Sequence, residues 1–77
     1  MIKPIKLKKV EDIEMINSIV SKYPYDIWIH GKSGMADAKS ILGMFILKLD
    51  EPLTIVVPDN VNYSLLFKEL SEYVQIS

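Results

Sequence analysis

The stretch that decides the fold runs from residue 25 to residue 37 and reads YDIWIHGKSGMAD. Its first six residues alternate with a period of two, which is typical of a half-buried strand. One face of that strand carries Tyr25, Ile27 and Ile29, and the other carries Asp26, Trp28 and His30. The segment Gly31-Lys32-Ser33-Gly34 has the composition of a turn, so residues 35–37 are expected to pair back as a short strand. The sequence therefore predicts an antiparallel hairpin.

Upstream of the hairpin the pattern predicts a strand followed by a helix. Residues 2–8 alternate apolar side chains with lysine from Ile5 onward, and Pro4 favours the beginning or edge of a sheet. From Val10 the apolar residues recur every three or four positions, which indicates an amphipathic helix over about 10–22. That helix is expected to end at Pro24, because proline disfavours the α conformation of the residue before it.

Downstream of the hairpin the chain returns to the sheet and ends in a helix. The run 41–47 is apolar throughout apart from its glycine, and periodicity alone does not decide between strand and helix. Residues 53–57 form the most β-branched segment and are expected to be a strand. Residues 61–74 are expected to be a helix, with Asp59, Asn60 or Asn62 as its N-cap.

This order of elements predicts one α+β domain over residues 1–77, an open-faced sandwich with an antiparallel sheet and its helices on a single face. The side chains expected at its centre are Ile16, Ile27, Ile29, Ile55, Leu66 and Leu70.

Composition limits the functions that such a domain can have. The 77 residues include no cysteine, which excludes disulfides, thiolate metal sites and thiol nucleophiles. The net charge is −1 and all nine basic residues are lysine, so neither nucleic acid nor an anionic membrane is an expected partner. No apolar run approaches the roughly 20 residues of a membrane helix and no export signal is evident, so we expect a cytoplasmic protein.

Three segments resemble the histidine-containing phosphocarrier protein HPr of the sugar phosphotransferase system. They are Ser21-Lys22-Tyr23, Lys39-Ser40-Ile41-Leu42-Gly43 and Leu53-Thr54-Ile55-Val56-Val57, and they stand at the same mutual spacings as in that family. The match covers nearly the whole chain and has no gap from about Ser21 to Asp59. It implies a βαββαβα fold with a four-stranded antiparallel sheet and three helices on one face, the ambiguous run being a short helix that starts near Ser40.

The site that carries phosphate in this family is degenerate here. The family motif is Gly-Ile-His-Ala-Arg-Pro-Ala at the start of the first helix, and its His, Arg and Pro fall on Lys9, Glu11 and Asp12. The carboxylates of the first turn would each repel a phosphate about 5 Å away by roughly 1 to 3 kcal/mol. We therefore expect no phosphate transfer through this site, no catalytic residue, no cofactor and no metal.

The resemblance also points to a regulatory serine and a surface for partner proteins. Ser40 matches the family's regulatory-serine position, and a serine at a helix start also serves as an N-cap. Six of the seven residues in 41–47 are large and apolar, so some must remain exposed, and we expect Ile41, Leu42 and Phe45 to contact a partner protein. Complete burial of these residues against the last helix is the alternative.

Three functions follow, from different classes. The first is an HPr-like regulatory or interaction module that has lost its phosphorylatable histidine and binds other proteins, such as phosphotransferase-system components or a transcriptional regulator. The second is a phosphocarrier with an unrecognised phosphoacceptor. The third is a small ligand-binding protein or enzyme that uses His30, which is disfavoured because no second ligand or acid–base partner stands at a suitable spacing.

Overall fold

The computed structural model describes residues 1–75 and has the element order β-α-β-β-α-β-α. Its elements are β1 (Ile2–Ile5), α1 (Val10–Val20), β2 (Trp28–Gly31), β3 (Gly34–Asp37), α2 (Ile41–Met44), β4 (Leu53–Val56) and α3 (Ser64–Glu69). The predicted α+β open-faced fold is confirmed. Among the described residues, no helix combines the length and the apolar character needed to cross a membrane.

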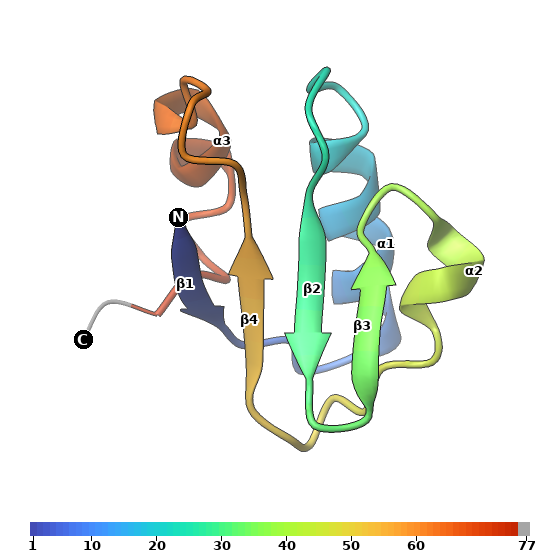
Figure 1. Ribbon diagram of the computed structural model, residues 1–77. Helices are drawn as coiled ribbons and strands as arrows, with labels where there is room; N and C mark the ends of the chain where they lie inside the picture. The colour runs from blue at the N-terminus through green and yellow to red at the C-terminus, as the bar shows by residue number, and fades with distance from the viewer. Residues whose placement is uncertain (76–77) are drawn as a thin grey trace.

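The four strands form one antiparallel sheet in the order β1-β4-β2-β3. Figure 1 shows the sheet with α1 running behind β2 and β3 and with α2 beside the outer strand β3. The helices lie on one face, and the other face of the sheet is open. This arrangement brings α1 and α2 next to each other, although 20 residues separate their ends in the sequence.

The core lies between the sheet and the helices, where the sequence places it. All six residues predicted to be central have no exposed surface. Trp28, on the other face of β2, is half-buried, and His30 is exposed. A shift of one residue in strand register would exchange these two sets, so the predicted register is confirmed.

The helices are shorter than the sequence pattern predicts. Residues 45–47 continue α2 only as tighter turns, in which each N–H donates to the carbonyl three residues earlier. At the other end of the chain, residues after α3 leave the helical path to pair with β1: Lys6 N donates to Tyr73 O at 2.8 Å and Gln75 N donates to Pro4 O at 2.9 Å. These bonds cover part of the outer edge of β1, and their formation explains why the predicted helix over 61–74 is not continuous.

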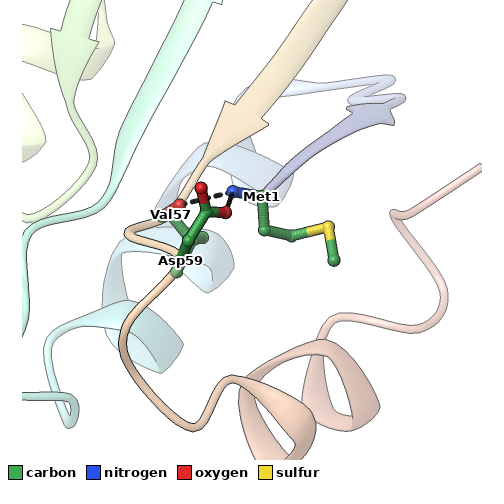
Figure 2. Close-up of polar contacts among 3 residues, drawn as sticks. All are labelled: Met1, Val57 and Asp59. Carbon is green, nitrogen blue, oxygen red and sulfur yellow. Dashed lines mark hydrogen bonds and ion pairs between the residues drawn. The ribbon is translucent and has the colours of Figure 1, made fainter.

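The pairing of β1 with β4 extends beyond the strands to the first residue of the sequence. Met1 O accepts a bond from Val57 N at 2.9 Å, and the Met1 amino group donates to Val57 O at 2.9 Å. The same amino group forms an ion pair with the carboxylate of Asp59, as Figure 2 shows. These contacts join the start of β1 to the turn that follows β4.

Candidate functional site

The start of α1, where the resemblance places a phosphate carrier, is closed by an acidic side chain. Asp12 Oδ2 accepts hydrogen bonds from Lys8 N at 2.8 Å and from Lys9 N at 3.2 Å. Lys9 occupies the N-cap position in extended conformation, and its carbonyl accepts from Asp12 N at 3.0 Å. Asp12 therefore supplies the cap that the lysine side chain does not, since an ammonium group has no acceptor atom.

Two acidic side chains stand in the first turn of α1. Glu11 is exposed in the first turn beside Asp12, and both carboxylates interact favourably with the positive end of the helix dipole. A phosphoryl group on residue 9 would meet these same two charges. The structure thus brings Lys9, Glu11 and Asp12 together, in an arrangement that stabilises the helix and opposes a second anion.

Ser40 begins α2 and caps it. Its backbone is extended, with φ −101° and ψ 104°, and its hydroxyl accepts a bond from Gly43 N at 3.3 Å. A Cβ atom at Gly43 would lie only 3.2 Å from Ser40 Oγ, so glycine leaves room for the hydroxyl to approach the backbone. The predicted capping role is confirmed, and the hydroxyl-bearing side chain is exposed.

The neighbours of Ser40 fix the loop that leads into α2. Asp37 Oδ1 accepts from Lys39 N at 2.9 Å, and Asp37 O accepts from Ser40 N at 2.9 Å. The Lys39 ammonium donates to the carbonyl of Tyr23, in the turn that follows α1. Lys39 therefore binds the backbone of another element and does not extend freely beside Ser40.

Apolar side chains cover the outer side of α2. Leu42 is 78% exposed, Ile46 is 60% exposed and Phe45 is 46% exposed. We call these three residues the α2 patch. Exposed apolar side chains three and four residues apart on a helix are neighbours, and a group of them is typical of a protein interaction site.

One of the expected contact residues is placed differently. Ile41 is half-buried and packs against the core, together with the fully buried Met44 and the buried Leu47. The inward positions therefore follow a spacing of three, and Ile46 replaces Ile41 on the outer side beside Leu42 and Phe45. The same spacing in the sequence could have identified Ile46.

One face of α1 borders the loop that leads into α2. Asn17 Nδ2 donates to Ala38 O at 3.0 Å, which fixes the side of α1 that faces this loop. Val10 and Glu14 precede Asn17 by seven and three residues and therefore share its side of the helix. Val10 is 52% exposed and Glu14 is also exposed, so the surface beside α2 continues as one apolar and one acidic side chain.

A cluster of three polar side chains joins the end of α1 to α3. Glu69 accepts hydrogen bonds from the Tyr23 hydroxyl and from the Lys22 ammonium. Burial and the bond to Glu69 raise the pKa of Tyr23 to about 12. The bonds from Lys22 and Tyr23 also lower the pKa of Glu69.

The segment with His30 is a hairpin and contains no assembled centre. Gly31 pairs with Gly34 across a two-residue turn, and Gly34 has φ +138°, a conformation that other residues rarely adopt. Ser33 donates from its N–H and its hydroxyl to Glu51 Oε1, at 3.0 and 2.7 Å, and these bonds lower the pKa of Glu51. Within residues 1–75 no group of three or more histidine and acidic side chains is placed to hold a metal ion.

A hollow lies elsewhere, between the β1–α1 connection and residues 49–53. It is an open groove of about 600 Å³ with Ile5, Leu7 and Leu53 among its lining residues. Its charged lining is mixed, with lysines at 6 and 8 and acids at 50 and 51. The mixture favours neither anions nor cations.

The fold and these side chains define a small α+β open-faced domain. Its most distinctive surface is formed by α2, a short apolar helix capped by Ser40, beside α1, whose start is capped by Asp12. Comparisons of the chain with family models, curated proteins and solved structures found no match.

Proposed function

We propose that this chain is an HPr-like domain that does not carry phosphate on histidine and acts in the cytoplasm as a regulatory or protein-interaction module. The observation that carries the proposal is the contrast between its two helix starts. At α1 the carboxylate of Asp12 occupies the backbone donors of Lys8 and Lys9. At α2 an exposed serine precedes an exposed apolar surface.

The α2 patch supplies the partner contact in this proposal. Leu42, Phe45 and Ile46 project from one helical turn and the turn after it, and Val10 adds apolar surface from α1. Such side chains become anchors when a partner covers them, and loss of one anchor typically weakens binding by about 1 to 3 kcal/mol. Phosphotransferase-system components and a transcriptional regulator are the partners that the resemblance suggests.

Ser40 supplies the regulation. A phosphate on its hydroxyl gains from the dipole of α2 and from the backbone N–H groups at the helix start. It adds about 1.5 to 2 negative charges directly beside the α2 patch, which changes the partners that the patch accepts without refolding the domain. Asp37 opposes this phosphate, and no arginine exists in the chain to bind it, so the modified serine stays available to a partner's cationic groups.

Intact-mass measurement tests the loss of the carrier function. The protein is incubated with phosphoenolpyruvate and the general phosphotransferase enzyme of the pathway, with an authentic HPr as positive control. We expect no phosphoryl adduct on the wild type, and little on Lys9→His, because Glu11 and Asp12 remain. An adduct on the wild type that disappears in His30→Ala would instead establish a phosphocarrier with an unrecognised acceptor.

A second incubation tests the regulation separately. The bifunctional serine kinase of a low-GC bacterium is expected to add one phosphoryl group to the wild type and none to Ser40→Ala. Lys39→Ala serves as a matched control that leaves the hydroxyl in place. An unmodified wild type would leave Ser40 with its capping role alone.

A further inference from the structure

The open face of the sheet, opposite the helices, is almost without charge. The strand register arranges its side chains in two rows, which are Ile2, Val56, Trp28 and Asp37, and then Pro4, Thr54, His30 and Met35. Asp37 is the only one of the eight that is an acid or a lysine, in a chain that is 25% charged. Antiparallel sheets with one face in water usually carry polar side chains on that face, whereas five of these eight side chains are apolar.

The apolar side chains of this face are exposed to a substantial extent. Ile2 is 63% exposed at one edge and Met35 is 54% exposed at the other, with the half-buried Trp28 and Val56 between them. In Figure 1 the sheet is seen from this side and no helix crosses it. Apolar surface of this extent, interrupted by little charge, is typical of a protein interface.

Along the β2–β3 hairpin, aspartates lie at one end of the face, whereas the turn at the other end carries a lysine together with Glu51, which accepts bonds from Ser33. Asp37 closes β3, and Asp26 lies just beyond the last pair of the β2–β3 ladder, where Ala38 N donates to Ile27 O. Lys32 lies in the turn at the opposite end of the same hairpin. All three side chains are exposed. A second copy turned end to end would place its lysine over the aspartates of the first, and its aspartates over the lysine.

We infer that two copies of this chain associate through the open faces of their sheets, about a two-fold axis perpendicular to the strands. Sheets pack face to face at about 10 Å, and a two-fold axis uses the same surface on both copies. The axis places the acidic end of each copy on the hairpin turn of the other copy, so this contact occurs twice in the dimer. The net charge of −1 per copy gives little repulsion between them.

The size of the face makes this dimer weak. Four strands of four residues span about 19 Å by 13 Å, from the usual strand spacing and rise. Side chains standing on that face bury on the order of 500 Å² per copy, which in total is at the low end for specific interfaces. An area of this size is typical of a weak association, so we expect the dimer to form only at high protein concentration.

Sedimentation equilibrium between about 10 μM and 1 mM tests the inference, since it distinguishes the 8.8 kDa chain from a dimer. Trp28 is the single tryptophan of the chain and lies within the proposed interface, so its emission is measured over the same range. Two methionine variants form a matched pair. Met35→Glu places a charge in the face, and Met15→Glu places the same charge on α1, where the methionine is 50% exposed.

We expect the wild type to approach twice its monomer mass while Trp28 emission shifts to shorter wavelength. Met35→Glu raises the dissociation constant at least about tenfold, Met15→Glu leaves it unchanged, and Lys32→Glu raises it a few-fold. Ile2→Glu, at the opposite edge of the face, provides a second variant, and circular dichroism verifies that each variant is folded. A wild type that remains monomeric at 1 mM overturns the inference. So does a dimer that Leu42→Glu disrupts and Met35→Glu does not, because that result places the interface on the α2 patch.

Discussion

Two residues of α2 differ in their roles: one stabilises the fold, and the other is free to bind a partner. Met44 is fully buried in the core, and Leu42, two residues earlier on the same helix, is 78% exposed. Both are large apolar side chains, and both can be truncated to alanine. The comparison of Met44→Ala with Leu42→Ala therefore tests whether the outer side of α2 contributes to stability or remains available to a partner.

The expected magnitudes differ several-fold. Only about a fifth of the Leu42 side chain is buried, so Leu42→Ala removes about 0.5 kcal/mol of hydrophobic stabilisation. Met44→Ala removes a fully buried side chain and leaves a cavity, which costs about 2 to 5 kcal/mol. A domain of 77 residues has a total free energy of unfolding of about 4 to 12 kcal/mol. Met44→Ala thus removes a large fraction of that stability, and Leu42→Ala removes little.

Urea unfolding followed by circular dichroism measures both variants against the wild type. We expect the urea midpoint of Leu42→Ala to stay close to that of the wild type and the urea midpoint of Met44→Ala to fall strongly. In thermal unfolding, the melting temperature should fall by about 4 to 8 °C for each kcal/mol of lost stability. Phe45→Ala is a third variant, since Phe45 is 46% exposed and should fall between the two. Equal destabilisation by Leu42→Ala and Met44→Ala would refute the placement of Leu42 outside the core and, with it, the α2 patch.

Three further predictions concern the caps and the junction of α1 with α3. Ser40→Ala removes the N-cap of α2 and is expected to lower the free energy of unfolding by about 1 kcal/mol, whereas Ser40→Asp, which keeps an acceptor, should lower it less in the same urea titration. Asp12→Ala frees the N–H groups of Lys8 and Lys9 and should cost about 1 kcal/mol, and Asp12→Asn should cost less; equal losses would mean that the charge and not the bonds matters. The raised pKa of Tyr23, about 12 against an ordinary 10.0, means that the folded state holds the phenolic proton more tightly than the unfolded chain. This contribution to stability is complete below pH 10 and is lost between about pH 10 and 12, so urea midpoints of the wild type should fall across that range. They should fall less steeply in Tyr23→Phe, where Tyr25 and Tyr73, whose pKa values burial also raises, still contribute. An unchanged slope in Tyr23→Phe would contradict the assignment.

The sheet could be predicted from the sequence because its signal is local. The alternation around Ile27 and Ile29 fixes which face is buried, and a slip of one residue would bury Trp28 and expose both isoleucines. The last helix was harder to predict because its end depends on residues distant in sequence. Residues 73–75 bond to Pro4 and Lys6 of the β1 segment, so tertiary pairing ends a helical pattern that the local sequence would continue.

The sequence predicted that the run 41–47 exposes apolar side chains, but it did not predict all of the residues that are exposed. The apolar run 41–47 contains no polar residue to mark its outer side, so the sequence favoured Ile41 where the structure exposes Ile46. The position of Lys39 could not be predicted either. Its ammonium reaches the carbonyl of Tyr23, 16 residues earlier, and only the packing of α1 against the α2 segment creates that contact.

Under the proposed function, the two helix starts differ in how they would accept a phosphate. At Ser40 the same oxygen that caps α2 is the oxygen that a kinase would modify, so the fold and the modification depend on one exposed residue. At α1 the two roles are divided: residue 9 would carry the phosphate, and Asp12 provides the cap. Replacing Lys9 by histidine therefore leaves a carboxylate bound to the backbone N–H of the same residue, and removing Asp12 to make room for phosphate weakens the helix that must hold it. If the proposal holds, a carrier site at α1 would require a new phosphoacceptor and a new cap at once, whereas the proposed control through Ser40 requires no change in the chain.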